Sequence, residues 1–504
     1  MKNSDLVFEL MERCGVKFGT SGARGRVIDM TDYVCYSYVT GFLQYLVETG
    51  DFFAGKQVAL AGDLRPSTPR ILAACATAIT DMGGDPVFCG YVPTPALALY
   101  AFGLGIPSLM VTGSHIPDDR NGIKFYRAEG EVLKTDEVGI TRQVLSVDPD
   151  LFDYAETLLR PAKLQDPVDV VTNYLARYVD YFGADALQGM RIGVYQHSAV
   201  GRYILFDLVS ALGAEALPLG LSDRFIPVDT EAIRPEDTEL ALKWAAEHKL
   251  DAIVSTDGDS DRPLIADHTG VWLRGDVLGA VCARILKADC VVTPVSSNTI
   301  VEKCGAFLQT IRTRIGSPYV IDAMAGATNS GFTRVCGYEA NGGFFVANDL
   351  KDGGHDGMRT LRSLPTRDAV LPMITILAAA KASVVSGKVN ALMADLPLRV
   401  THSNRIPEFP IAHSNALLAY FLEGSFRDQI ARANELFVEV FGPVSQIDTT
   451  DGFRISFDNG DIIHLRPSGN APELRCYSES TNADNASRIN AAALDAILAS
   501  APWQ

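Results

Sequence analysis

Three aspartates at alternate positions, Asp257, Asp259 and Asp261, follow the apolar run of residues 252–254 in the segment TDGDSDRPLIAD. Carboxylates held this close repel one another unless a hard divalent cation lies between them. The segment begins like a calcium-binding EF-hand loop but lacks the glycine and the glutamate that such a loop needs. An oxygen cluster with open positions is instead typical of Mg²⁺, which keeps water ligands and accepts a phosphate oxygen. The alternative is a solvated acidic turn.

A serine, Ser114, lies in the segment VTGSHIPDDRNGIKFY, where a predicted strand over residues 109–111 runs into a turn and Pro117 delays any helix. We expect this serine to be exposed on a sharp turn, where its hydroxyl could act as a nucleophile. An ordinary Ser/Thr turn would have the same sequence. The continuation over residues 121–124 favours the chemical interpretation, because it returns Lys124 to the same point.

Two further segments could hold the parts of a phosphorylated sugar. In CGYEANGGFF, the carboxylate of Glu339 and the amide of Asn341 could bind neighbouring hydroxyls, although a hairpin turn at Asn-Gly explains the same residues. In HLRPSGNAPELRCYSES, several donors between two predicted strands could cradle a phosphate, and a plain Pro-Gly turn is the alternative. These donors are Arg466, Ser468, Gly469 and Asn470. Near the start, KFGTSGARGR adds Arg24 beside glycines and hydroxyls, or is only a flexible basic turn.

The composition indicates a globular chain with an acidic surface. Its 504 residues include 44 Lys and Arg against 61 Asp and Glu, a formal net charge of −17. This charge repels nucleic acid and anionic membranes, so we expect neither as a partner, and a phosphorylated substrate needs a local cluster of donors. The nine cysteines contain no CxxC pair, and neither a signal peptide nor a membrane span is indicated. We therefore expect a cytoplasmic protein.

Repeated α/β units are predicted to position these segments. A strand, a turn, a helix over residues 69–82, glycines and a second strand follow one another over residues 57–90. The same order recurs over residues 191–220 and, more weakly, from residue 290. The last hundred residues instead indicate a smaller α+β domain that ends in a helix over residues 483–499. Boundaries are expected near residues 159–168 and 396–410.

The segments KFGTSGARG, VTGSHIPDDRNGIK, DGDSDR, GYEANGG and RPSGNAPE resemble, in the same order, the motifs of the α-D-phosphohexomutase superfamily. The resemblance covers nearly the whole chain. It implies an α/β fold of four domains around a central cleft: three related α/β domains with mixed sheets plus a smaller C-terminal α+β domain. We place a phosphoserine loop in domain I (1–165), a metal-binding loop in domain II (166–274), a sugar-binding loop in domain III (275–392) and a phosphate-binding loop in domain IV (393–504).

The resemblance also implies a role for each candidate residue. Ser114 matches the serine that carries a phosphoryl group, and an oxygen of that group would join Asp257, Asp259 and Asp261 as a Mg²⁺ ligand. Four residues match the surroundings of the transferring phosphoryl group: Arg24, His115, Lys124 and Arg262. Glu339 and Asn341 match ligands of the sugar hydroxyls. Arg466, Ser468, Gly469 and Asn470 match the loop that holds the phosphate not being transferred.

The chain departs from the superfamily pattern at a few positions. Ile116 stands where many members have asparagine, and Asn470 with Ala471 replaces a more usual Thr-Glu. Asn341 occupies a position that is often serine, and Gly343 one where some members carry a histidine near the phosphoserine. If that histidine acts as an acid or base elsewhere, another group must do so in this chain.

The implied activity is that of an isomerase, a phosphohexomutase that interconverts hexose 6-phosphate and hexose 1-phosphate through a phosphoserine enzyme and a 1,6-bisphosphate intermediate. The cofactor would be one Mg²⁺ per site, with a sugar 1,6-bisphosphate as activator. The motif variants favour a phosphomannomutase, then a phosphoglucomutase or dual-specificity enzyme, and last a phosphoglucosamine mutase. Outside this class, a serine phosphatase or sulfatase would use the same hydroxyl and metal, and a non-catalytic sensor would ordinarily lose one of them. We expect a monomer or a homodimer.

Overall fold

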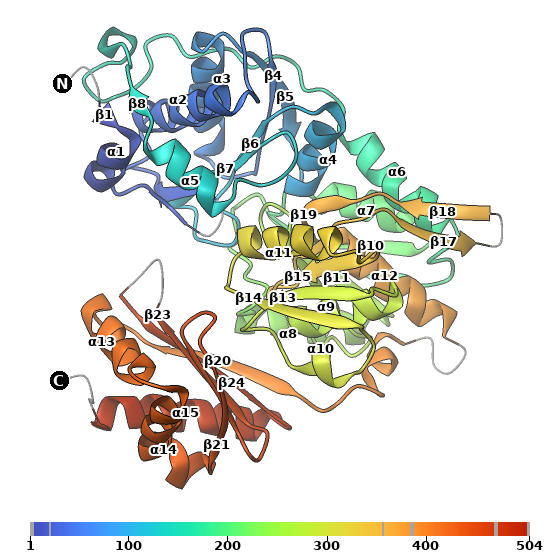
Figure 1. The fold of residues 1–504 in the computed structure, drawn as a ribbon. Helices are drawn as coiled ribbons and strands as arrows, with labels where there is room; N and C mark the ends of the chain where they lie inside the picture. The colour runs from blue at the N-terminus through green and yellow to red at the C-terminus, as the bar shows by residue number, and fades with distance from the viewer. Residues whose placement is uncertain (1–4, 20–21, 355–356, 384–387, 468–471, 501–504) are drawn as a thin grey trace. The chain divides into compact units, whose positions relative to one another are not determined.

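The computed structural model describes residues 5–19, 22–354, 357–383, 388–467 and 472–500 of the chain (Figure 1). The chain falls into two compact units, one made of residues 1–291 and 316–394 and the other of residues 292–315 and 395–504. The larger unit contains two complete α/β domains and most of a third. The smaller unit contains the C-terminal sheet with its helices.

The first domain is a mixed six-stranded sheet with helices packed on it. Its elements are β1 (Asp5–Leu6), α1 (Val7–Cys14), β2 (Lys17–Phe18), β3 (Ala23–Arg26), α2 (Asp32–Thr49), β4 (Gln57–Gly62), α3 (Thr68–Asp81), β5 (Asp85–Tyr91), α4 (Thr94–Leu104), β6 (Ser108–Val111), β7 (Arg120–Tyr126), α5 (Lys134–Thr141), β8 (Val144–Leu145) and η1 (Pro149–Leu151). The strand order is β2-β3-β7-β6-β4-β5, and β4 pairs in parallel with β5 and β6. Because β4 and β6 are apolar runs buried beneath helices, their carboxyl ends deliver the polar turns that follow to one edge of the sheet.

The second domain repeats this plan with four strands in the order β10-β9-β11-β12. Its elements are α6 (Val171–Phe182), β9 (Arg191–His197), α7 (Arg202–Ala211), β10 (Glu215–Leu221), α8 (Pro235–His248), β11 (Ala252–Thr256) and β12 (Pro263–Ala266). The next helix, α9 (Gly275–Ile285), opens the third domain. β9 runs parallel to β10 and β11, and β12 returns antiparallel to β11. The order β9-α7-β10 matches β4-α3-β5, which confirms the first two predicted copies of the unit.

The third predicted copy is divided between the two units. β13 (Cys290–Pro294) begins at the end of the larger unit, whereas α10 (Ile300–Lys303) and β14 (Gln309–Thr313) belong to the smaller one. The helix of this copy is only four residues long, which explains why its sequence signal is weak. The rest of the third domain lies in the larger unit: α11 (Ser317–Asn329), β15 (Val335–Tyr338), β16 (Phe344–Val346), β17 (Leu350–Gly354), β18 (Gly357–Leu361), β19 (Leu364–Asp368), α12 (Val370–Ala382) and η2 (Val389–Met393).

The smaller unit carries an antiparallel sheet in the order β20-β24-β23-β22-β21. Its elements are β20 (Val400–Ile406), α13 (Ile411–Leu422), α14 (Phe426–Phe441), β21 (Val444–Asp448), β22 (Phe453–Phe457), β23 (Ile462–Pro467), β24 (Leu474–Ser480) and α15 (Ala483–Ser500). The three helices lie together on one face of the sheet (Figure 1), where the rings of Phe421 and Phe453 stack at 4.6 Å. The predicted α+β domain is therefore confirmed, as is the α/β fold class.

The apolar stretch of residues 369–380 forms the buried helix α12, whose first two turns include Pro372. Among the helices that the structure describes, none has the length and apolar character needed to span a bilayer.

Candidate active site

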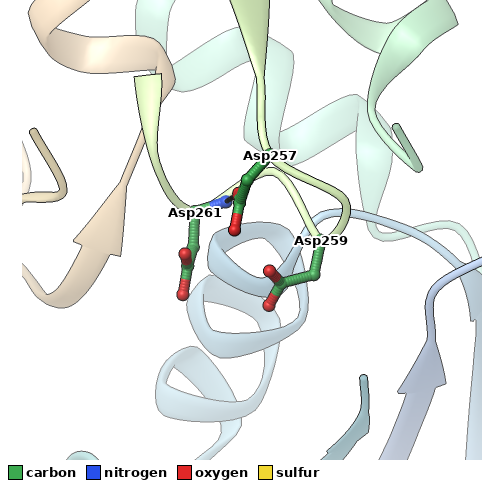
Figure 2. A group of neighbouring side chains, drawn as sticks. All are labelled: Asp257, Asp259 and Asp261. Carbon is green, nitrogen blue, oxygen red and sulfur yellow. Dashed lines mark hydrogen bonds between the residues drawn. The ribbon is translucent and has the colours of Figure 1, made fainter. Parts of the chain in front are cut away.

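The loop between β11 and β12 brings the three aspartates together (Figure 2). The carboxylates of Asp257, Asp259 and Asp261 are buried, and one oxygen of each lies within 4.8 Å of the others. Ser260 adopts a left-handed backbone conformation (φ 58°), so the loop turns sharply and directs alternate side chains to one side. The predicted cluster of carboxylates is confirmed, and the solvated acidic turn is excluded because none of the three is exposed.

The chemistry of this cluster fits a divalent cation. Within the described ranges, Asp259 Oδ1 and Asp261 Oδ1 are buried and accept no hydrogen bond. Burial, and then the charges of Asp259 and Asp261, raise the pKa of Asp257 well above its ordinary value. The loop therefore holds more negative charge than its surroundings balance at Asp257, and an ion ligated by all three carboxylates would remove that repulsion.

Ser114 lies against this cluster. Its hydroxyl donates a hydrogen bond to Asp257 Oδ2 (2.6 Å), and its backbone N–H donates to Thr112 Oγ1 (2.8 Å). The backbone at Ser114 is left-handed (φ 57°), an uncommon conformation for a residue with a side chain, so the predicted sharp turn is confirmed.

The expected exposure of Ser114 is wrong, because this residue has no accessible surface. The loop of the second domain covers it so closely that a Cβ added at Gly258 would lie 2.7 Å from the carbonyl oxygen of Ser114. Turn-forming residues predict the local backbone conformation, but they do not predict which part of another domain packs against the turn.

Cations surround the cluster as predicted. Lys124 Nζ donates to Asp259 Oδ2 (2.6 Å) and to Asp261 Oδ2 (2.5 Å). Arg262 Nη1 lies 2.8 Å from His115 Nδ1. Because burial and the charges of Arg262 and Arg24 hold the pKa of His115 well below its ordinary value, the imidazole is neutral and accepts this hydrogen bond.

The sugar-binding candidates occupy the turn between β15 and β16. These strands pair antiparallel, so the hairpin interpretation of GYEANGG is correct for the backbone. Gly343 N donates to Asn341 Oδ1 (3.0 Å), and Thr230 Oγ1 donates to the carbonyl oxygen of Asn341 (2.8 Å). Glu339 Oε2 accepts a hydrogen bond from Arg367 Nη1 (3.0 Å), which ties the turn to the aspartate cluster through one side chain.

Two buried arginines belong to this site that the sequence did not identify. Arg65 pairs with Asp63 and donates to the carbonyl oxygens of Ser114 (3.0 Å) and Ile116. Arg367 Nε donates to Asp261 Oδ2 (2.9 Å) in addition to its bond with the turn between β15 and β16. The sequence did contain a signal for Arg65. Its partner Asp63 directly follows β4, and the carboxyl end of β4 neighbours that of β6, which leads to Ser114.

Replacing Arg65 with methionine is expected to lower stability and turnover together. The change leaves Asp63 buried and unpaired, which costs about 3–5 kcal/mol of unfolding free energy. It also releases the turn of Ser114, where a displacement of about 1 Å can cost roughly 100-fold in rate. Thermal unfolding and steady-state kinetics measure the two effects, with Arg191→Met, which removes an exposed ion pair with Glu215, as the control. Turnover within threefold of wild type would contradict the positioning role of Arg65.

The phosphate-binding candidates lie in the smaller unit. Arg466 Nε donates to Asp451 Oδ1 (2.9 Å), and Asp451 Oδ2 accepts from the backbone N–H of Ile315 (2.9 Å). Arg466 is therefore held in a defined orientation at the end of β23. Ser468, Gly469 and Asn470 lie outside the described residues. The structure thus brings together the candidates of the first three domains, all of which are in the larger unit.

Comparison with known proteins covers most of the chain. Four family models match in order: phosphoglucomutase/phosphomannomutase α/β/α domain I at residues 15–149, domain II at 171–270, domain III at 274–399 and the C-terminal domain at 423–496. The chain is 42% identical to a phosphomannomutase of Salmonella muenchen over 495 residues, 97% of each chain. It is 44% identical to a phosphomannomutase of Sinorhizobium fredii strain NGR234 over 485 residues, 95% of this chain and 98% of that one.

The fold has counterparts among solved structures. A phosphoglucomutase/phosphomannomutase family protein from Burkholderia thailandensis superposes with a TM-score of 0.72, covering 96% of this chain and 97% of that one. The two sequences are 20% identical, so this similarity concerns the fold alone.

Proposed function

Because the chain belongs to the phosphoglucomutase/phosphomannomutase family, we propose that it is a phosphomannomutase, which interconverts mannose 6-phosphate and mannose 1-phosphate. One observation carries the proposal for this chain's own residues. The hydroxyl of Ser114 in the first domain lies 2.6 Å from Asp257 of the carboxylate cluster in the second. A serine hydroxyl beside a divalent-cation site is the arrangement that a phosphoserine intermediate needs.

The balance of charge supports the binding of a phosphoryl group together with a metal ion. In formal charge, the four carboxylates of the aspartate cluster and the sugar-binding turn are matched by four cations, and Asp63 is paired with Arg65. The matching is uneven and leaves Asp257 the least balanced. Mg²⁺ would add two positive charges, and a phosphoryl group carries about −1.5 to −2 at pH 7. The carboxylates are Asp257, Asp259, Asp261 and Glu339, and the cations are Arg24, Lys124, Arg262 and Arg367.

In the proposed reaction, the phosphorylated Ser114 donates its group to the free hydroxyl of mannose 6-phosphate or mannose 1-phosphate. The P–O bond to Ser114 Oγ breaks as the bond to the sugar oxygen forms, and the proton of the sugar hydroxyl ends on Ser114 Oγ, which restores the serine hydroxyl. The resulting 1,6-bisphosphate turns over in the site, and Ser114 Oγ then accepts the other phosphoryl group. Mg²⁺, held by Asp257, Asp259 and Asp261, would neutralise charge on the transferring group.

Each group of the site has a distinct task in this scheme. Lys124 and Arg262 neutralise charge around the transferring oxygens, and Arg24 adds a third cation. Glu339 and Asn341 bind sugar hydroxyls in both orientations of the bisphosphate. Arg466 and the loop of Ser468, Gly469 and Asn470 hold the phosphate that is not transferred. A sugar 1,6-bisphosphate would act as activator, because it can phosphorylate Ser114 again after the group has been lost.

Phosphorylation requires the groups around Ser114 to move apart. A phosphoryl group cannot be attached to an oxygen that hydrogen-bonds Asp257 at 2.6 Å without displacing that carboxylate. Lys124 likewise contacts two of the predicted metal ligands. We therefore expect the carboxylate of Asp257 and the ammonium group of Lys124 to shift when Ser114 is phosphorylated and the ion is bound.

Helix α9 closely approaches the turn between β15 and β16 that carries Glu339 and Asn341, here called the sugar turn, and this contact gives a prediction. A Cβ added at Gly275 would lie 2.4 Å from Gly342 N and 2.6 Å from the carbonyl oxygen of Ala340. Because both atoms belong to the backbone, Gly275→Ala must displace the turn that carries Glu339 and Asn341. We expect kcat/KM for the hexose phosphate to fall by about 10- to 100-fold, which steady-state kinetics measure.

The control for this prediction is Gly326→Ala in α11. Gly326 is also helical, and nothing lies within 4 Å of a Cβ added there. This substitution is expected to raise helix stability by roughly 1 kcal/mol and to leave the kinetics unchanged. Equal kinetics for Gly275→Ala and Gly326→Ala would contradict the proposed position of the sugar turn.

A direct assay tests the proposed function and its alternatives. The enzyme is incubated with Mg²⁺, a trace of sugar 1,6-bisphosphate and the 1-phosphate of mannose, glucose or glucosamine. We expect formation of the 6-phosphate with the highest kcat/KM for mannose. A preference for glucose or glucosamine would reassign the substrate, and release of inorganic phosphate without isomerisation would replace the mutase by a phosphatase.

A further inference from the structure

Three arginines beside the aspartate cluster have buried nitrogen atoms that make no hydrogen bond to any described residue. These atoms are Nε of Arg24, Nε of Arg262 and Nη2 of Arg367. A buried donor without an acceptor is costly, so such groups commonly mark a site for water or for a bound anion. The three side chains also lie close enough to influence one another. Burial, followed by the charges of Arg262 and Arg367, lowers the pKa of Arg24 to about 10.

Arg367 is the member of this group to which the sequence motifs give no role. Arg367 lies at the carboxyl end of β19, and only 1% of its surface is exposed. Its Nε donates to Asp261 Oδ2 at 2.9 Å, and its Nη1 donates to Glu339 Oε2 at 3.0 Å. Arg367 therefore bridges a proposed metal ligand and a proposed sugar ligand, while its third nitrogen stays available.

The glycine at position 343 makes room for this arginine. A Cβ added at Gly343 would lie 2.6 Å from Cδ and 2.8 Å from Cγ of Arg367. The stem of Arg367 thus fills the space that any side chain at position 343 would need.

We propose that Arg367 binds the phosphoryl group which Ser114 donates and accepts, as a third arginine beside Arg24 and Arg262. The inference rests on the proposed mutase function and adds a phosphoryl-binding residue to it. An arginine guanidinium stays protonated in proteins, and the carboxylates of Asp261 and Glu339 bind this one on two of its nitrogens. Arg367 therefore supplies a fixed charge and a hydrogen-bond donor to the transferring oxygens and takes no part in proton transfer.

The first test is the pair Arg367→Met and Arg367→Lys. Methionine keeps an apolar stem and loses the charge, so we expect kcat to fall about 100-fold or more, as when a preorganised donor is removed. Lysine restores the charge, so kcat of Arg367→Lys should be at least tenfold higher than kcat of Arg367→Met. Arg127→Met, which removes a partly exposed guanidinium paired with Asp51 and Asp136, is the control and should stay within twofold of wild type. Turnover of Arg367→Met within threefold of wild type overturns the proposal.

The concentration of Mg²⁺ separates this role from an effect on the metal site alone. Asp261 loses a competing cation in Arg367→Met, so we expect the half-saturating Mg²⁺ concentration to stay equal or to fall. A raised half-saturation, with kcat restored at high Mg²⁺, would show that Arg367 only orients a metal ligand and would overturn the proposal.

Gly343→Ala provides a test that keeps the arginine. The added methyl group must displace the stem of Arg367, so we expect a loss of kcat of about tenfold or more in the wild-type background. In Arg367→Ala the same methyl group no longer meets the arginine stem and keeps only Asn341 Oδ1, at 3.1 Å, as a tight neighbour. Gly343→Ala should then cause a much smaller loss than in the wild-type background. Additive losses in the double variant would contradict the shared site of the two residues.

A binding measurement separates failure of this inference from failure of the proposed function. Affinity for orthovanadate, an analogue of the transferring phosphoryl group, is measured by calorimetry on dephosphorylated wild type and on Arg367→Met and Arg367→Lys, all with Mg²⁺. At least tenfold weaker binding by the methionine variant supports the phosphoryl site even if no hexose phosphate is isomerised. Equal binding by folded wild type and Arg367→Met overturns the site even if mutase activity is found.

Discussion

Replacing Ser114 with alanine is expected to lower mutase turnover by about 10⁴-fold or more, because no phosphoserine can then form. Binding of mannose 6-phosphate should change little, since the hydroxyl of Ser114 contacts only Asp257 and His115 among the described residues. Steady-state turnover and equilibrium binding of the sugar phosphate measure the two outcomes. Turnover within tenfold of wild type would refute the assignment of Ser114.

The conformation of Ser114 calls for a second variant. Alanine must adopt the same left-handed backbone (φ 57°), whereas glycine does so without steric cost. Ser114→Gly therefore lacks the hydroxyl but keeps or gains stability in the folded turn. If both variants are equally inactive, and the glycine variant unfolds at or above the temperature of the alanine variant, the loss belongs to the hydroxyl and not to the turn.

Replacing Asp257 with asparagine is expected to give the second largest effect, with opposite signs for activity and stability. The amide can keep the existing bonds, with Oδ1 accepting from the backbone N–H groups of Asp261 and Arg262 and Nδ2 directed to Ser114 Oγ. Because the charged form of Asp257 is disfavoured in this loop, its neutral isostere should raise the unfolding temperature of the metal-free protein.

The same substitution removes a charged metal ligand. We expect the half-saturating Mg²⁺ concentration to rise at least 100-fold and kcat to fall about 100- to 1,000-fold, by the loss of charge at the metal. Asp251→Asn is the matched control, because Asp251 precedes the other end of β11 and accepts from the backbone N–H of Arg191 (2.8 Å). A normal Mg²⁺ dependence of Asp257→Asn would contradict the metal site.

Much of the site was predictable from the sequence because its signals are local. Ser114 and the three aspartates lie in turns that begin directly after an apolar strand, and such turns lie at the carboxyl ends of the strands, where sites form. The unit β4-α3-β5 also begins and ends within two residues of the predicted bounds. Glycines and polar turns that interrupt the apolar runs are enough to predict such turns and the bounds of such α/β units.

The remaining features depend on contacts between distant parts of the chain. Arg367 and Asp261 are 106 residues apart, and nothing in LPTRDAV indicates which carboxylate this arginine meets. Ser114 is buried because a loop of another domain covers it, and a turn signal contains no information about that packing. The third repeat has a helix of only four residues, so the periodic pattern that identifies the other two copies is nearly absent there.

The central claim is that one phosphoryl group passes between Ser114 and the two oxygens of a hexose. The most direct measurement incubates dephosphorylated enzyme and Mg²⁺ with mannose 1,6-bisphosphate labelled with ³²P, followed by unlabelled mannose 6-phosphate. We predict label on the peptide that contains Ser114, and its transfer during the chase into mannose phosphates with little inorganic phosphate. Label on another residue, or its release as inorganic phosphate at the rate of turnover, would contradict the account.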